Sequence, residues 1–359
     1  MRDQGRYELA VIGAGSAGFS AAITAAELGT RVALIGHGTI DGTCVNTGCV
    51  PSKILIRATE ALHQARAATR FAGISVKASV EDWRTVMRGK DALVNSLRRP
   101  KYIDLLPAYD TIAYIEGWAR LSESGIAVDG RLLSVDKVII ATGASPALPP
   151  IPGIEGVPYL TSTMALDLQR LPRSLLVIGG GYIGCELGQM FARAGVAVTI
   201  VDIVPILSAG EPEISAALAG YLREEGILLR EGVRPTAIRE TASGVALDVA
   251  VGENSETVEA GQVLVTTGRR PNTAGLGLEE VGVDLLPNGG IKVDDRMRTT
   301  RAGIYAAGDV TGRDQFVYMA AYGARIAAKN ALNGDGKSAT MRPRCRSSFS
   351  RTRRWRASD

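Results

Sequence analysis

The chain has 359 residues, of which 46% are hydrophobic and 22% are charged. This length allows two or three domains with ordinary apolar cores. The formal net charge is +4, but residues 341–359 contain seven arginines and one aspartate, so the remainder carries a charge of about −2. We therefore expect no nucleic-acid partner for the body of the chain. No apolar run approaches ~20 residues and no leader precedes the first strand, which predicts a cytoplasmic protein without a membrane partner.

The N-terminal region predicts a dinucleotide-binding unit. Its parts, in order, are a strand at 7–13, the glycines Gly13, Gly15 and Gly18, a helix at 19–29 and a strand at 31–35. Such glycines allow a tight turn, close approach to a pyrophosphate and close packing of helix on strand, and the helix N-terminus faces the phosphates. Gly36 stands where an acidic residue usually binds the ribose. Because glycine has no side chain for that bond, tight adenosine binding is in question.

Two cysteines, Cys44 and Cys49, lie five positions apart and precede a predicted helix at 52–68. The pair could be a structural disulfide, half of a metal site or a redox dithiol. Structural zinc usually needs four grouped ligands, whereas the other cysteines and the two histidines lie elsewhere without ligand spacing. A structural disulfide is disfavoured in a chain that looks cytosolic. The choice therefore depends on the rest of the chain.

A second dinucleotide unit follows a segment rich in proline and glycine at 146–158, which predicts a domain junction. Its parts are a strand at 174–178, the glycines Gly179, Gly181 and Gly184, a helix at 185–195 and a strand at 196–201. Asp202 ends this unit, where a carboxylate binds an unphosphorylated ribose, which favours NADH over NADPH. Alternatively, Asp202 caps a loop or a helix. Two such units indicate two bound dinucleotides, or one and a relic.

Three further motifs complete the pattern. A strand ending in Ala141, Thr142 and Gly143 is echoed by one ending at Gly268 and followed by Arg269, and a third strand ends in Asp309. Together, in this order, the GxGxxG, CxxxxC, ATG, second GxGxxG and GD motifs resemble the flavin-dependent pyridine nucleotide–disulfide oxidoreductases over roughly residues 6–335. The resemblance implies an α/β fold with two Rossmann-like, three-layer dinucleotide-binding domains, one for FAD and one for NAD(P), and without the family's interface domain.

The resemblance also implies a division into domains and a set of site residues. The domains are 1–145 as the first part of the FAD-binding domain with the cysteine pair, 146–268 as the NAD(P)-binding domain, 269–335 as the return to the FAD-binding domain, and 336–359 as an aberrant tail. FAD would contact Gly13, Gly15, Gly18, Thr43, Ala141, Thr142, Gly143 and Asp309. NADPH or NADH would contact Gly179, Gly181, Ile183, Gly184, Asp202, Gly268 and Arg269. Tyr182 would gate the nicotinamide pocket, and Lys53 and Glu186 would form a pair beside flavin and nicotinamide.

The implied chemistry passes electrons from NAD(P)H through FAD to the cysteine pair. Cys49 would be the thiol nearer the flavin, and its place near a helix start with Lys53 one turn on favours the thiolate. Cys44 would be the exchanging thiol that faces the substrate. Residues 44–57, Lys101 with Tyr102, and residues 315–321 are similar to the mercuric reductase branch. This similarity implies Hg(II), a soft ion suited to thiolates, as a small substrate that is reduced to Hg(0).

Two other functions are weighed against this one: a dihydrolipoamide dehydrogenase-like reductase and an inactive dinucleotide-binding fragment. Mercuric reductases commonly use NADPH, so Asp202 is a departure from that branch. The family continues beyond residue 336 into the interface domain that makes the homodimer, whereas this chain continues into arginine-rich sequence. That sequence could be a disordered nucleic-acid tail. We favour a frameshift, because a shifted reading of the same codons can give a segment resembling the start of the interface domain, and we expect impaired activity.

Overall fold

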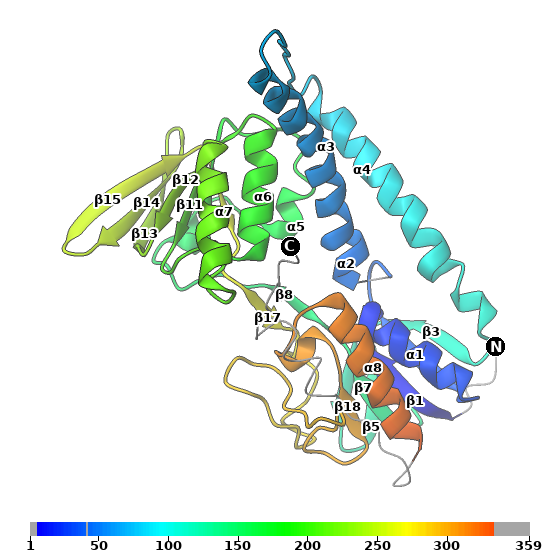
Figure 1. Cartoon of the computed structure of the whole chain (residues 1–359). Helices are drawn as coiled ribbons and strands as arrows, with labels where there is room; N and C mark the ends of the chain where they lie inside the picture. The colour runs from blue at the N-terminus through cyan, green and yellow to red at the C-terminus, as the bar shows by residue number, and fades with distance from the viewer. Residues whose placement is uncertain (1–5, 41, 334–359) are drawn as a thin grey trace, which may run out of the picture. The chain divides into compact units, whose positions relative to one another are not determined.

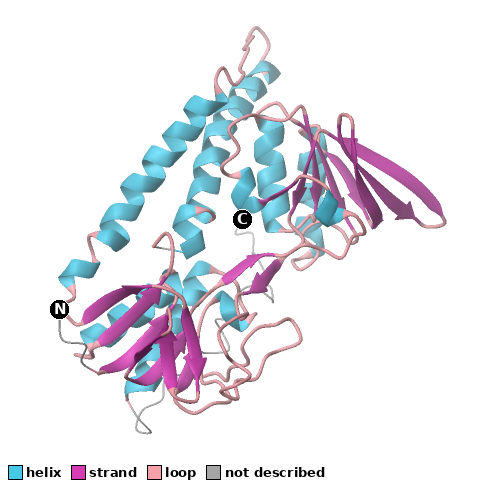
Figure 2. Cartoon of the chain, turned by 180° about the vertical axis from the view of Figure 1, so that it is seen from behind, coloured by secondary structure: helices cyan, strands magenta, loops and turns pink. Residues whose placement is uncertain are grey.

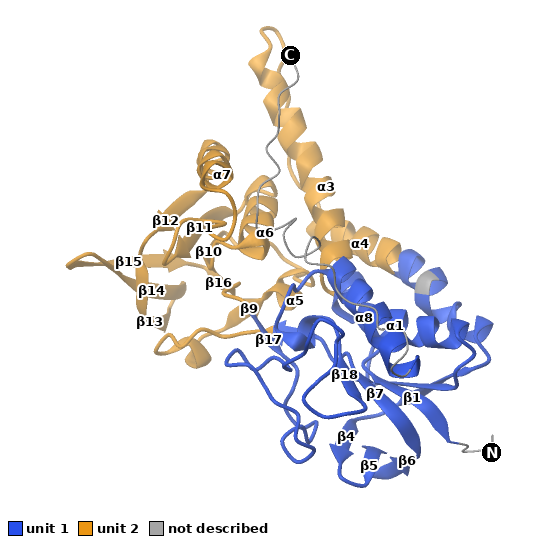
Figure 3. Cartoon of the chain, turned by 60° about the horizontal axis from the view of Figure 1, so that its bottom comes forward, with its two compact units in different colours: residues 1–46, 95–145, 269–351 blue, residues 47–94, 146–268, 352–359 orange. Residues whose placement is uncertain are grey.

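A computed structural model describes residues 6–40 and 42–333 of the chain. The arginine-rich tail, and with it the frameshift hypothesis, lies outside these residues. The described residues fall into two compact units, shown in two colours in Figure 3. Unit 1 comprises the described residues of 6–46, 95–145 and 269–333, and unit 2 comprises residues 47–94 and 146–268.

Both units contain helices and strands (Figure 1). The α-helices are α1 (Ser16–Glu27), α2 (Gly42–Asn46), α3 (Cys49–Ala67), α4 (Trp83–Arg98), α5 (Ser162–Ala165), α6 (Tyr182–Arg193), α7 (Pro212–Glu224) and α8 (Val317–Leu332). The strands of unit 1 are β1 (Tyr7–Ile12), β2 (Val32–Gly36), β3 (Ile112–Glu116), β4 (Ala119–Ser122), β5 (Gly125–Val128), β6 (Arg131–Leu133), β7 (Val135–Ile140), β17 (Arg269–Pro271) and β18 (Ile304–Ala306). β8 (Ala144–Pro146), which ends at the boundary between the units, pairs with β17. The strands of unit 2 are β9 (Tyr159–Thr161), β10 (Ser174–Ile178), β11 (Ala197–Asp202), β12 (Leu228–Glu231), β13 (Arg234–Thr241), β14 (Gly244–Val251), β15 (Asn254–Ala260) and β16 (Gln262–Val265). Short turns of helix are η1 (Ala68–Arg70), η2 (Arg99–Ile103), η3 (Leu106–Ala108), η4 (Ile154–Gly156) and η5 (Asp309–Thr311).

Unit 1 is built on a parallel sheet in the order β18-β7-β1-β2-β3. Successive side chains of a strand point to opposite faces, so each strand supplies two cores. Leu9 and Val11 of β1 pack in the core shared with α1 and α8, whereas Ala10 and Ile12 pack in the core shared with the antiparallel strands β4, β5 and β6. Burial on both faces explains why these strands read as continuous apolar runs.

Unit 2 repeats this design on a parallel sheet in the order β12-β11-β10-β16-β9. Leu175 and Val177 of β10 pack with the helices, and Leu176 and Ile178 pack with the antiparallel strands β13, β14 and β15. In Figure 2 these antiparallel strands extend on the side of the sheet away from its helices. The expected α/β fold with two three-layer units is therefore confirmed.

Helices α3 and α4 are attached to unit 2. Leu55 of α3 is fully buried in the core that contains α6. On α4, the Trp83 indole N–H donates to the Leu168 carbonyl at 2.8 Å, and the buried Lys90 ammonium donates to the Leu166 carbonyl at 2.9 Å. These main-chain carbonyls follow α5, where a helix end leaves carbonyls without intrahelical donors. The helix that begins at Cys49 is thus anchored in the unit with the second glycine turn.

None of the helices in the described part of the chain combines the length and the apolar character that a bilayer span requires. Residues 47–94 pack with residues 146–268 in unit 2. The division into an FAD-binding and an NAD(P)-binding domain, which assigns residues 47–94 to the FAD-binding domain, stays a prediction.

Candidate functional site

The first glycine turn is shaped by contacts that exclude any side chain. Gly13 has φ +113°, and a Cβ there would lie 2.3 Å from the Ala141 carbonyl oxygen. A Cβ on Gly18 would lie 1.7 Å from the Gly13 carbonyl oxygen. The Ala141 N–H donates to the Ile12 carbonyl at 2.7 Å, so residues 141–143 lie directly beside this turn. The structure therefore brings these predicted cofactor residues together.

The same turn presents a site that fits a pyrophosphate. Helix α1 begins at Ser16, and its N-cap residue Gly15 is extended and offers no side chain to the first N–H groups. Such unpaired donors at a helix N-terminus attract an anion. A Cβ on Gly42 would lie 2.7 Å from the Gly15 Cα, so α2 starts against the turn with Thr43 exposed and Cys44 half-buried. The residues present thus fit the phosphates of a dinucleotide.

The second glycine turn repeats these contacts in unit 2. A Cβ on Gly179 would lie 2.7 Å from the Thr266 carbonyl oxygen, and one on Gly184 would lie 1.9 Å from the Gly179 carbonyl oxygen. Gly181, the N-cap of α6, again offers no side chain to the first turn of its helix. Tyr182 and Ile183 follow it, and both are exposed. This turn also fits an anionic phosphate group.

Asp202 supports the second turn from the end of β11. Its Oδ2 accepts the Gly180 N–H at 2.5 Å, and its Oδ1 accepts the Val204 N–H at 3.2 Å. The carboxylate is therefore held in one orientation by the loop that it supports, as the capping alternative expected. Its role toward a ribose stays a prediction.

Asp309 lies in unit 1 on the turn that follows β18. Burial raises the pKa of the Asp309 carboxyl above its usual range, although the charge of Arg269, whose Nε lies 4.0 Å from Oδ2, acts in the opposite direction. The Arg269 guanidinium also donates to the Ala144 carbonyl. The structure thus groups Arg269 with the first turn's neighbours, whereas Gly268, exposed and with φ +135°, ends unit 2. The predicted contact of both residues with the nicotinamide nucleotide remains untested.

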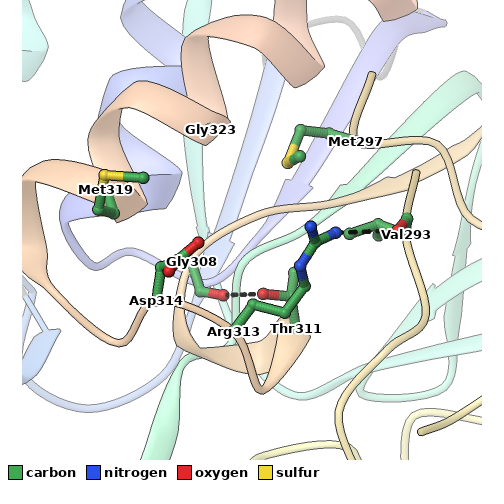
Figure 4. A pocket seen from close by; sticks show the side chains of 8 residues that line it. All are labelled: Val293, Met297, Gly308, Thr311, Arg313, Asp314, Met319 and Gly323. Carbon is green, nitrogen blue, oxygen red and sulfur yellow. Dashed lines mark hydrogen bonds between the residues drawn. The ribbon is translucent and has the colours of Figure 1, made fainter. Parts of the chain in front are cut away.

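A small cavity is lined in part by residues of this turn, including Gly308 and Thr311 (Figure 4). Its volume is about 20 Å³, enough for about one water molecule. The Thr311 hydroxyl donates to the Gly308 carbonyl at 2.8 Å, and the Arg313 guanidinium donates to the Val293 carbonyl at 3.0 Å. These bonds keep the turn that carries Asp309 in shape, and the cavity itself is too small for a nucleotide.

The cysteine segment places Cys49 at the start of α3, where it is exposed. One turn later, the Lys53 ammonium lies 2.5 Å from the Glu186 carboxylate of α6. The predicted Lys53–Glu186 pair is therefore formed, with more than a third of each side chain exposed. Exposed pairs contribute about 0–1 kcal/mol to stability, so this contact matters for the position of the two charges. The helix start and the lysine both favour a thiolate at Cys49.

A cluster centred on Glu225 was not foreseen from the sequence. Arg193 binds both oxygens of this carboxylate at 2.7 Å, Gln189 donates to it at 2.7 Å, and His63 Nδ1 lies 3.7 Å away. Burial opposes ionisation, yet Arg193, His63 and Gln189 hold the pKa of Glu225 below its usual range. The cluster borders a hollow of about 490 Å³ that also includes Tyr221. Its members lie on α3, on α6 and at the C-terminal end of α7, so no local sequence pattern signals it.

Cys185 follows the second turn and is buried, with its Sγ 3.3 Å from the Gly180 carbonyl oxygen. Burial and the nearby charges of Asp202, Glu231 and Glu186 raise the pKa of this thiol to about 12. Within residues 6–40 and 42–333, no group of three or more His, Cys, Asp or Glu side chains is placed to hold a metal ion.

Comparison with known proteins identifies the family. A family model described as pyridine nucleotide-disulphide oxidoreductase matches residues 7–328. The chain belongs to this family. Its relatives include a mercuric reductase of Streptomyces lividans, 42% identical over 91% of this chain and 70% of the relative. A mercuric reductase of Staphylococcus aureus is 43% identical over 91% of this chain and 60% of the relative.

A solved structure of the family agrees with the fold. The HOCl-induced flavoprotein disulfide reductase RclA from Escherichia coli matches with a TM-score of 0.79 and 33% identity, over 92% of this chain and 72% of that chain. The resemblance inferred from the motifs is thus confirmed, and the chain is a pyridine nucleotide–disulfide oxidoreductase.

Proposed function

We propose that this oxidoreductase reduces Hg(II) to Hg(0) with electrons from a nicotinamide nucleotide, through FAD and the Cys44/Cys49 pair. The observation that carries the proposal is the cysteine segment, where α2 with Cys44 starts against the first glycine turn and Cys49 starts α3. The mercuric reductases that match over about nine tenths of this chain support the choice of substrate. The homodimer implied by the resemblance and the cytoplasmic location expected from the sequence pattern stay predictions.

The residues of the chain supply binding and charge control for this reaction. When bound in unit 1, FAD supplies the transfer of an electron pair from the nicotinamide to the dithiol. Cys49 lies at a helix start, where the helix dipole favours the thiolate form. Thiolates are soft ligands that suit Hg(II). Reduction of Hg(II) to Hg(0) consumes the two electrons of one hydride and leaves NAD(P)⁺ and a proton.

We further propose NADH as the preferred reductant. The Asp202 carboxylate ends β11 and is oriented by the Gly180 and Val204 N–H groups. A 2′-phosphate at this place would meet that negative charge, whereas an unphosphorylated ribose can donate hydroxyl hydrogen bonds to it. The segment 203–211 contains no lysine or arginine to bind a phosphate. The Asp202 carboxylate thus favours NADH in two ways, because it attracts the ribose hydroxyls and repels a 2′-phosphate.

The test is oxidation of NADH by the purified, FAD-loaded chain, followed with and without Hg(II) and with lipoamide as the competing acceptor. We expect Hg(II) to accelerate oxidation and to leave as volatile Hg(0). Cys44→Ala and Cys49→Ala should each abolish this acceleration, and Cys185→Ala should retain it because that thiol is buried. Preferential turnover of lipoamide, or Hg(II)-dependent oxidation that survives Cys49→Ala, would contradict the proposal. A protein that cannot be loaded with flavin would support the inactive-fragment alternative.

A further inference from the structure

The end of β2 has no room for the acidic side chain that usually binds the adenosine ribose. A Cβ on Gly36 would lie 2.8 Å from the Ala14 Cβ and 3.3 Å from the Tyr114 hydroxyl oxygen. Ala14 belongs to the first glycine turn and Tyr114 to β3. In other dinucleotide units a carboxylate at this place accepts hydrogen bonds from the ribose. Unit 1 must therefore hold an adenosine group by other means.

An aromatic pair stands directly beside this place. The His37 ring stacks on the Trp118 ring, with centroids 3.5 Å apart and planes inclined by 18°. His37 follows β2, and Trp118 follows the neighbouring parallel strand β3. The Gly117 N–H donates to the Gly36 carbonyl at 2.9 Å, which ties the two strand ends together. Parallel α/β sheets bind ligands outside these carboxyl ends.

The backbone beneath the indole is fixed. The Trp118 N–H donates to Asp129 Oδ1 at 2.9 Å, and the Asp129 N–H donates to the Trp118 carbonyl at 3.0 Å. Gly117 has φ +150°, and a Cβ there would lie 2.5 Å from Asp129 Oδ2. Even so, the Trp118 side chain is 67% exposed. A large, rigidly supported aromatic surface in water loses little conformational entropy when a flat ligand covers it.

We propose that the His37–Trp118 pair binds the adenine ring of the flavin dinucleotide by stacking, in place of a carboxylate on the ribose. The inference rests on the proposed binding of FAD to unit 1. Aromatic stacking suits a purine because the base offers a π-face whatever its hydrogen-bonding groups, and each stacked base changes affinity by about 5–150-fold. The adenine half rather than the isoalloxazine half is expected here because the pair stands at the carboxyl end of β2, where a dinucleotide unit binds the adenosine ribose.

The test compares ligands that do and do not contain adenine. FAD, ADP and FMN are titrated separately into the flavin-free full chain, and binding is measured by equilibrium dialysis and by quenching of tryptophan fluorescence. We expect Trp118→Ala to weaken FAD and ADP about tenfold or more and to leave FMN unchanged, with His37→Ala giving a smaller loss. Trp118→Phe should retain most of the affinity. Leu132→Ala removes another exposed apolar side chain of unit 1 and serves as the matched control.

The outcomes separate this inference from the proposed function. Unchanged FAD and ADP affinity in Trp118→Ala, or an equal loss for FMN, would overturn the stacking site. A chain that binds ADP in a Trp118-dependent way but takes no flavin would support the stacking site and overturn the proposed function. Failure to bind either FAD or ADP would overturn both.

Discussion

The two glycine turns of the chain are alike at their start and different at their end. In each, a Cβ on the third glycine would enter the carbonyl oxygen of the first, at 1.7 Å for Gly18 and at 1.9 Å for Gly184. At the end of the second strand, however, unit 2 has Asp202 and unit 1 has Gly36. The glycines are demanded by the packing of helix on strand, which any such unit must keep. The strand-end residue serves the ligand, so it can differ between units that share one fold.

The largest expected effect comes from adding a methyl group at the shared position. Gly18→Ala and Gly184→Ala should each lower the free energy of unfolding by about 3 kcal/mol or more, because the new Cβ meets backbone that cannot move aside. Urea unfolding measures the change. Gly220→Ala on α7 has open space around its Cβ and should instead gain about 0.5–1 kcal/mol. Equal midpoints for Gly184→Ala and Gly220→Ala would show that the turn tolerates a side chain.

An aspartate at residue 36 of unit 1, matching Asp202 of unit 2, should lower the free energy of unfolding and should not create a ribose contact. Gly36→Asp places a Cβ 2.8 Å from the Ala14 Cβ, and we expect a loss of about 1–3 kcal/mol with no gain in FAD affinity. The exposed Gly156 has nothing near its Cβ, so Gly156→Asp should change stability by less than about 0.5 kcal/mol. Tighter FAD binding by Gly36→Asp would mean that the site does accept a carboxylate.

A glycine at residue 202 of unit 2, matching Gly36 of unit 1, should weaken the binding of the nicotinamide nucleotide. Asp202→Gly removes the acceptor of the Gly180 and Val204 N–H groups together with the proposed ribose ligand. We expect NADH affinity to fall about tenfold or more and the preference over NADPH to narrow, because hydrogen bonds to a charged group are worth about 1.5–3 kcal/mol. Calorimetric titration of both nucleotides measures this, with the exposed Glu253→Ala as control. An unchanged ratio of the two affinities would remove Asp202 from nucleotide selection.

The smallest effect concerns the residue after each third glycine, Phe19 in unit 1 and Cys185 in unit 2. Because folding raises the pKa of Cys185 from 9.0 to about 12, its stabilising contribution is complete below pH 9 and is lost as the pH rises toward 12. Cys185→Ala should flatten that part of the pH–stability curve. Alkylation at pH 8, read by peptide mass spectrometry, should label Cys49 readily and Cys185 only after denaturation. Equal labelling rates in the native protein would contradict the assigned burial.

The sequence predicted what depends on local pattern. The strand expected at 174–178 is β10, and both glycine turns lie between strand and helix as expected, because apolar runs and glycine spacing encode them directly. The sequence also indicated the Lys53–Glu186 pair, but only through the family resemblance. It did not indicate that α3 packs in unit 2, or that Glu225 gathers Arg193 and His63, because these contacts join helices far apart in the chain. The lack of an acidic side chain at residue 36 was evident in the sequence. The His37–Trp118 stack was not, because it joins the ends of two strands that are far apart in the chain.

The anchoring of α4 has a consequence for how the chain can diverge. Trp83 donates to the main-chain carbonyl of residue 168 and Lys90 to that of residue 166, and the Lys90 ammonium also lies 3.8 Å from the Asp167 carboxylate. Substitution at residue 166 or 168 leaves a carbonyl in place to accept each bond, whereas substitution of either donor removes its bond. For these two hydrogen bonds we therefore expect no compensating exchange between donor and acceptor residues. Methods that detect contacts through correlated substitutions should miss both bonds and detect α4 only through its side-chain packing with residues such as Leu166.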